Sequence, residues 1–203
     1  MKSVMFMHPL MYEFGIRFLY FDGLKILKHI IGKKKKVFEP ACGYGRIKRF
    51  ISNTCEYSGI DLNERFIKYG QKRKINIKVG NILDIDNYKR SDVIVLSDIL
   101  HHLNMKDIQK LFSIAVRFAN EKIVIVEPEF ITFAAKKNFV SRVLGKFMAF
   151  MDYDGINEIE KWLSEEEYEN LFYNIKKAND IEELKIKKFR RHYFVEMFIN
   201  GKK

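Results

Sequence analysis

The sequence predicts an α/β fold, in which helices cover both faces of a mostly parallel sheet. Short apolar segments alternate with amphipathic ones along residues 37–129, as expected when strands and helices follow each other in a parallel sheet. Residues 91–98, SDVIVLSD, form a continuous apolar run that is typical of a strand buried on both faces. Residues 183–200 read as two strands around a turn near Arg190-Arg191, which predicts an antiparallel edge.

The elements can be placed in order along the chain. Residues 10–31 read as one or two helices that end at Gly32. Residues 75–83 alternate in hydropathy, which indicates a strand, and Ser164 with Glu167 forms a capping box for a helix. The predicted strands are 37–39, 56–62, 75–83, 91–98 and 121–129, and the predicted helices begin or lie at 46–52, 64–73, 105–119 and 163–172.

Composition narrows the class of protein. A chain of 203 residues suits one domain with a real core. Cys42 and Cys55 lack metal-ligand spacing, which favours a reduced, cytoplasmic setting. We see no signal peptide, and no run reaches the roughly 18 apolar residues that a membrane-spanning helix needs. The net charge of +11 favours anionic partners, so nucleic acid and an acidic membrane surface stay open, but the basic residues are spread along the chain.

A glycine-rich turn follows the first predicted strand. It reads Glu39-x-Ala41-x-Gly43-x-Gly45, and glycines there let the backbone approach a ligand closely. Asp61 ends the next predicted strand, where an acid can accept both hydroxyls of a ribose. A nicotinamide site would require a third glycine at the position of Lys48, so a dehydrogenase is disfavoured.

Four segments in order resemble the class I, Rossmann-like S-adenosylmethionine-dependent methyltransferases. They are VFEPACGYGR, YSGIDL, VGNILDI and DVIVLSDILHHL, and the terminal strand pair also fits, so the resemblance spans roughly residues 35–200. It implies a seven-stranded, mostly parallel sheet with helices on both faces and an antiparallel C-terminal pair. It also implies one methyltransferase domain, 1–203, divided into a helical cap (1–32), a cofactor-binding core (33–129), a substrate or lid insertion (130–160) and a C-terminal helix with strands (161–203).

The resemblance implies a binding site for S-adenosylmethionine. The expected cofactor residues are Glu39, Ala41, Gly43, Gly45 and Ser97 around the methionine portion, Asp61 at the ribose, and Leu62, Asn81 and Ile82 at the adenine. Two positions depart from the family pattern. Ala41 stands where glycine is usual, and Asn81 stands where aspartate is usual.

Candidate catalytic residues follow the fourth predicted strand. Asp98, His101 and His102 lie where a base would help if the nucleophile is a hydroxyl or a protonated amine. The alternative is that the histidines only cap or pack the loop. Glu127, which ends the next strand, is a further candidate, with a purely structural role beside Pro128 as its alternative. We expect no metal ion.

The acceptor is the least determined part. Tyr12 on the N-terminal helix, and Tyr153 and Asp154 beyond the fifth strand, are candidate substrate residues. Residues 138–151 have one apolar helical face, which packs in the core or covers an apolar acceptor. With 18 phenylalanines in the chain, this favours a small, apolar or lipid-like acceptor. An RNA methyltransferase and a cofactor-binding protein without activity remain alternatives, and the sequence sets neither the acceptor atom nor the oligomeric state.

Overall fold

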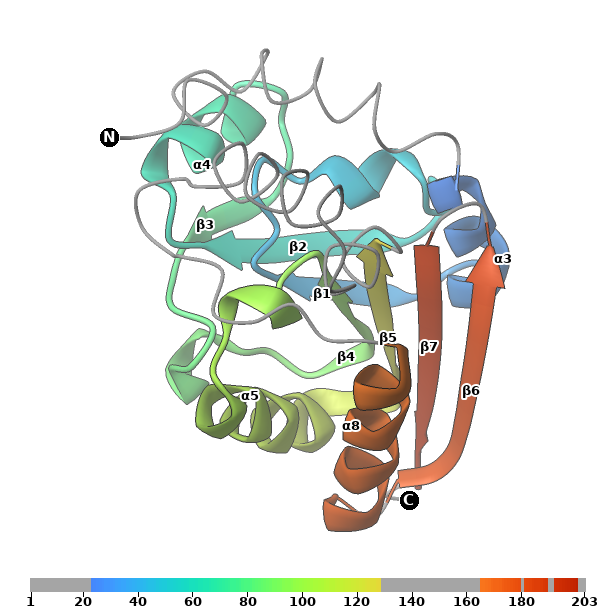
Figure 1. Ribbon diagram of the computed structural model, residues 1–203. Helices are drawn as coiled ribbons and strands as arrows, with labels where there is room; N and C mark the ends of the chain where they lie inside the picture. Colours follow the sequence, from blue (N-terminus) through green and yellow to red (C-terminus); the bar gives the residue numbers. More distant parts are fainter. Residues whose placement is uncertain (1–22, 129–164, 180, 190–191, 201–203) are drawn as a thin grey trace, which may run out of the picture.

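A single mixed sheet organises the computed structural model, which describes residues 23–128, 165–179, 181–189 and 192–200. Within these residues the sheet has seven strands in the order β3-β2-β1-β4-β5-β7-β6 (Figure 1). The strands are β1 (Lys36–Pro40), β2 (Glu56–Asp61), β3 (Ile77–Val79), β4 (Ser91–Ser97), β5 (Ala119–Pro128), β6 (Ile181–Phe189) and β7 (His192–Ile199).

The strand directions confirm the predicted fold class. β3, β2, β1, β4 and β5 run parallel to one another, whereas β7 is antiparallel to both β5 and β6. β7 lies inside the sheet because its side chains are mostly apolar and buried. β6 exposes Glu and Lys side chains and forms the edge, where charged side chains discourage pairing with another chain.

Helices cover the two faces of the sheet, as predicted. The described helices are η1 (Gly23–Ile26), α3 (Leu27–Ile31), α4 (Glu64–Gln71), α5 (Met105–Phe118) and α8 (Glu165–Ala178), with the short 3-10 turns η2 (Arg46–Arg49), η3 (Ile85–Asn87) and η4 (Leu100–His102). Figure 1 shows α3 and α4 on one face and α5 and α8 on the other.

The core has one layer on each side of the sheet. Along β4, Val93 and Val95 pack with α3 and α4, while Ile94 and Leu96 pack with α5 and α8. This alternation is the period-two geometry of a strand that is buried on both faces. The predicted apolar face of α5 is buried at its four positions, Ile108, Leu111, Phe112 and Ala115.

Two predicted elements are shorter than the sequence suggested. The expected helix after the glycine turn is only η2, because the following Ser52 and Thr54 bond each other's side chains at 2.9 Å instead of continuing a helix. The strand expected at 75–83 is only β3, because the Asn81 side chain accepts the Leu83 N–H at 2.9 Å and turns the chain. Residues 10–22 and the cap residue Ser164 lie outside the described residues.

Three of the four lysines at 33–36 lie in the connection from α3 to β1, and Lys36 is the first residue of β1. Three of them are exposed, and the fourth, Lys35, lies 2.7 Å from a Glu121 carboxylate oxygen. Their prediction as a solvated connection is therefore confirmed. Among the described helices, none is both long enough and apolar enough to span a membrane.

Candidate active site

The carboxyl ends of four neighbouring strands bring the predicted cofactor residues to one edge of the sheet. Glu39 lies near the end of β1 and the glycine turn follows that strand. Asp61 ends β2, Asn81 follows β3 and Ser97 ends β4. The chain proceeds from β1 to β3 in one direction and continues at β4 on the other side of β1. The point between β1 and β4 is thus the switch point at which ligands bind in open α/β sheets.

The turn after β1 has an unusual backbone. Ala41, Gly43 and Gly45 have φ angles of 60°, 54° and 81°, all in the left-handed region. Glycine adopts this region freely, but an alanine there is strained by about 1–2 kcal/mol. The turn is held against β2 because the Cys42 N–H donates to the Ile60 carbonyl at 2.9 Å.

Gly59 on β2 allows this close approach. A Cβ at Gly59 would lie 2.7 Å from the Cys42 Cβ and 2.8 Å from the Glu39 carbonyl oxygen, closer than side chains approach each other. The sequence analysis did not single out Gly59. Glycine inside a strand is the signal that could have identified it, since it often marks a close backbone approach.

Asp61 clamps the turn to the end of β2. Its Oδ2 accepts the Gly43 N–H at 2.7 Å, and its Oδ1 accepts the Asn63 N–H at 2.7 Å. Both oxygens of this carboxylate therefore take part in holding the chain around the end of β2. Asp61 is half-buried, as a residue between a loop and a bound ribose would be.

The predicted adenine residues differ in exposure. Leu62 is 42% exposed and Val79 is 47% exposed, and Val79 is the register partner of Asp61, so two apolar side chains lie beside the clamp. Asn81 is also exposed, whereas Ile82 is buried in the core. Exposed apolar side chains at a site edge suit the flat, apolar faces of a purine ring.

Comparisons with known proteins agree with this geometry. Residues 37–122 match the family model of a methyltransferase domain. The structure resembles a Thermotoga maritima protein titled a "possible histamine N-methyltransferase", with a TM-score of 0.67, 12% identity, and coverage of 96% of this chain and 97% of that one. Residues 37–122 therefore contain a methyltransferase domain, and the fold is that of solved S-adenosylmethionine-dependent methyltransferases. The expected methyltransferase domain and fold are therefore confirmed.

Other solved methyltransferases share the fold at low identity. The Synechocystis PCC 6803 magnesium protoporphyrin IX methyltransferase with bound S-adenosylhomocysteine has a TM-score of 0.58 at 14% identity, covering 88% of this chain and 81% of that one. Human N-acetylserotonin methyltransferase in complex with S-adenosylmethionine has a TM-score of 0.67 at 12% identity, covering 94% and 55%. A comparison with curated protein sequences finds no match.

Glu39 is a buried acid at the predicted methionine side of the candidate site. It is 2% exposed, and the Tyr57 hydroxyl donates a hydrogen bond to its Oε2. Burial raises the pKa of the Glu39 carboxyl well above its ordinary value, while the hydrogen bond from Tyr57 acts in the opposite direction. Tyr57 was not predicted, because an aromatic residue in a strand looks like ordinary core.

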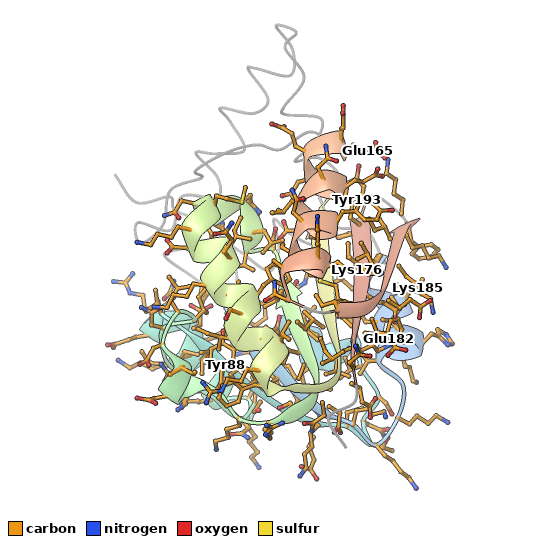
Figure 2. All side chains as sticks on the ribbon, turned by 90° about the horizontal axis from the view of Figure 1, so that it is seen from below. Tyr88, Glu165, Lys176, Glu182, Lys185 and Tyr193 are labelled. Carbon is orange, nitrogen blue, oxygen red and sulfur yellow. The ribbon has the colours of Figure 1, made fainter. Side chains whose placement is uncertain are left out.

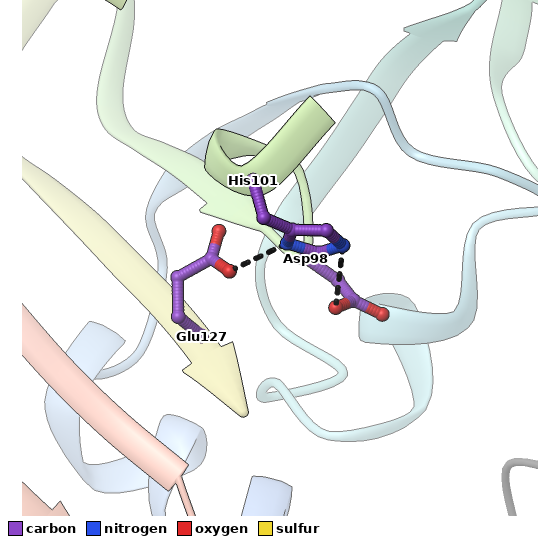
Figure 3. Close-up of side chains that lie close together, drawn as sticks. All are labelled: Asp98, His101 and Glu127. Carbon is purple, nitrogen blue, oxygen red and sulfur yellow. Dashed lines mark hydrogen bonds and ion pairs between the residues drawn. The ribbon is translucent and has the colours of Figure 1, made fainter. Parts of the chain in front are cut away.

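A second polar cluster follows β4 and β5. The His101 Nδ1 lies 3.0 Å from the Glu127 Oε2, and its Nε2 lies 4.0 Å from the Asp98 Oδ1 (Figure 3). His101 and Glu127 are each 1% exposed, whereas the Asp98 side chain is 20% exposed. His102 is half-buried, and its ring centroid lies 4.2 Å from that of His101 with the two rings tilted by 39°. The structure therefore brings the three predicted catalytic residues together with Glu127.

Tyr168 on α8 is the polar neighbour that the sequence analysis missed. Its ring stacks on that of Tyr193, 6.3 Å away, and Tyr193 is the register partner of Glu127; Figure 2 shows Tyr193 beside α8. Burial, with the charges of Glu127 and Asp98, raises the pKa of Tyr168 well above its ordinary value. Among the described residues its hydroxyl has no hydrogen-bond partner. Tyr12, Tyr153 and Asp154 lie outside the described residues.

Proposed function

We propose that this protein transfers a methyl group from S-adenosylmethionine to a small, apolar or lipid-like molecule. The observation that carries the cofactor half is the turn after β1, which the Asp61 carboxylate holds at the switch point of the sheet. S-adenosylmethionine supplies an activated methyl group, so the protein mainly has to align the acceptor and exclude water.

The acceptor half of the proposal has two supports. The names of three structural neighbours contain magnesium protoporphyrin IX, histamine and N-acetylserotonin. All three are small molecules. The 18 phenylalanines and the apolar face predicted at residues 138–151 favour an apolar acceptor. We place the reaction in the cytoplasm, because both cysteines of the chain are free.

Calorimetric titration of S-adenosylmethionine and S-adenosylhomocysteine into the protein tests the cofactor site. Asp61→Asn keeps one acceptor oxygen for the turn but removes the charge that a ribose would meet. We expect binding about 10–100-fold weaker, because hydrogen bonds to a charged group contribute about 1.5–3 kcal/mol.

Asp92→Asn is the matched control. Asp92 also accepts a backbone N–H, from Lys36 at 2.8 Å, but it lies at the opposite edge of the sheet, near the start of β4. Its variant should bind both ligands as the unmodified protein does. Equal weakening by the two substitutions, or no binding by the unmodified protein, would overturn the cofactor assignment.

A panel of acceptors tests the second half. Methyl transfer to apolar small molecules or lipid vesicles would support the proposal. The net charge of +11 makes RNA the competing acceptor. Transfer to RNA alone would replace the small-molecule proposal, and cofactor binding with no transfer to any class would indicate a binding protein.

A further inference from the structure

Three segments that lead into strands carry a dense set of basic residues. They are residues 33–36 at the start of β1, residues 72–74 before β3 and residues 89–90 before β4. They read KKKK, KRK and KR, which gives nine basic residues and no acidic one. All but Lys35 are exposed. Because the segments are far apart in the chain, the sequence alone does not show them as one cluster.

The fold brings the three segments to one edge of the sheet. β1, β2, β3 and β4 run parallel, so a segment that leads into any of them arrives at the same, amino edge (Figure 1). In the order β3-β2-β1-β4, the first and last strands are three spacings apart, which is about 15 Å. We call residues 33–36, 72–74 and 89–90 the basic edge.

The acids beside the basic edge neutralise only part of its charge. They are Glu56, Asp92 and Glu121, near the starts of β2, β4 and β5. Asp92 accepts the Lys36 backbone N–H at 2.8 Å, and Glu121 pairs with Lys35 at 2.7 Å. Nine basic and three acidic residues leave a formal charge of +6. Within the described part of the chain, six side chains of the edge form no ion pair: Lys33, Lys34, Lys36, Lys72, Lys74 and Lys89.

Two of these lysines have a backbone conformation that suits glycine better. Lys34 and Lys74 have φ angles of 57° and 59°, in the left-handed region that disfavours a residue with a Cβ. Glycine or asparagine is the favoured residue in such a turn. Backbone strain that is kept in this way is found often at functional sites, and here the basic side chain is what both positions share.

The chemistry of the basic edge fits a nucleic acid better than a membrane surface. Stable attachment to a membrane usually combines basic charge with an apolar or lipid anchor. Of the exposed large apolar side chains in the described residues, none lies in the three segments. Arg73 offers a planar cation instead, with its guanidinium carbon 3.5 Å from the centre of the Tyr69 ring. Unpaired bases stack on aromatic rings and on guanidinium planes.

We infer that the basic edge binds the sugar–phosphate backbone of a nucleic acid, on the side of the sheet opposite the candidate active site. β1 and β4 have five and seven residues, so the two edges lie about 15–25 Å apart. The carboxyl edge instead carries acids at or next to strand ends, Asp61, Asp98 and Glu127, which repel a polyanion. The nucleic acid is thus a docking partner and not the methyl acceptor, so the inference goes beyond the proposed function and does not depend on it.

A salt titration tests the contact with phosphates. Fluorescence anisotropy measures binding to labelled oligouridine and to an RNA duplex, each about 20 nucleotides long. If four to six lysines contact phosphates, the slope of log K against log salt should be about −3 to −5. Affinity should then fall about 60–1000-fold between about 50 and 200 mM salt. No binding to either RNA, or a slope near zero, would overturn the inference.

A triple variant removes one charge from each segment of the basic edge. Lys34→Gln, Lys74→Gln and Lys89→Gln together should make the slope shallower by about 2–3 and weaken RNA binding about 100-fold near 50 mM salt. The corresponding triple variant with arginine keeps the charge and should bind RNA as the unmodified protein does. Equal loss in the glutamine and arginine variants would mean that the charge is not what binds, and would contradict the inference.

A second triple variant is the matched control. Lys106→Gln, Lys110→Gln and Lys187→Gln remove the same charge from exposed lysines on α5 and β6. This variant should keep the slope of the unmodified protein and nearly all of its affinity. If it loses as much affinity as the variant of the basic edge, binding follows the net charge of the whole protein, and the assigned site is wrong.

Two measurements separate this partner from the active site and from a membrane. S-adenosylhomocysteine should bind the RNA-saturated protein as it binds the free protein, because the two edges are opposite. Competition between the two ligands would place the RNA in the active site and overturn the inference. Co-sedimentation with vesicles of equal parts phosphatidylserine and phosphatidylcholine should be weaker than RNA binding at the same salt. Stronger retention on vesicles, lost in the glutamine variant of the basic edge, would assign this surface to a membrane.

Discussion

Two buried tyrosines provide a matched test of how polar groups contribute to the stability of this fold. Tyr57 donates its hydroxyl to the buried Glu39 carboxyl, whereas the Tyr168 hydroxyl has no hydrogen-bond partner among the described residues. Both side chains are nearly inaccessible, at 6% and 2% exposure. Tyr57→Phe and Tyr168→Phe remove the same atom, so the difference between them isolates the hydrogen bond.

The expected effects have opposite signs. Tyr57→Phe leaves a buried acid without its donor, which costs about 1–3 kcal/mol of unfolding free energy. Tyr168→Phe removes a polar group that was buried without a partner, so we expect stability to rise by about 1 kcal/mol. The two variants should therefore differ by about 2–4 kcal/mol. In a domain of this size, that difference corresponds to melting temperatures about 4–16 °C apart.

Urea unfolding measures both variants, with cofactor absent. The slope against urea concentration should be unchanged, since neither substitution alters the surface exposed on unfolding. If Tyr168→Phe destabilises the protein as much as Tyr57→Phe does, the Tyr168 hydroxyl is hydrogen-bonded to a buried water. The reasoning that assigns it an unpaired state would then be wrong.

Two further predictions concern the methionine side of the site. Ala41→Gly should raise stability by about 0.5–1 kcal/mol, since relief of a left-handed alanine outweighs the extra entropy of glycine in the unfolded chain; a lower melting temperature would contradict this. The second concerns Glu39, whose pKa is raised in the folded state. Above the ordinary pKa of 4.5, the folded chain therefore binds more protons than the unfolded chain does. Stability should therefore fall as pH rises from 4.5 through the folded pKa, and Glu39→Gln should remove that part of the fall; parallel unfolding profiles across about pH 4 to 8 would refute it.

The order of strands and helices could be predicted from the sequence because the period of the hydropathy pattern and the length of each apolar segment indicate the type of element. The five parallel strands and the terminal pair were each placed from such patterns. The lengths of β3 and η2 could not be predicted in this way. β3 ends where the Asn81 side chain bonds the nearby backbone, and η2 is followed by Ser52 and Thr54, whose side chains bond each other. Such local side-chain bonds cannot be inferred from the hydropathy period.

The cofactor edge could be predicted, but its supports could not. Asp61 and the glycines lie at strand ends, which the pattern identifies. The contact of Glu39 with Tyr57 and the space at Gly59 depend on which strands are neighbours and in which register. Likewise, Glu127 is 26 residues from His101 in the chain, and only the pairing of β4 with β5 brings them together.

The contacts that hold the turn after β1 are all made within the protein. Asp61 accepts the Gly43 N–H, the Ile60 carbonyl accepts the Cys42 N–H, and Gly59 leaves room for both. The turn is therefore ordered on folding, and a ligand that binds there need not supply the free energy of ordering it. It follows that stability and cofactor affinity are coupled at this edge. A substitution that loosens the turn should reduce both, and Asp61→Asn is one, because an amide has a single acceptor oxygen for the Gly43 and Asn63 N–H groups.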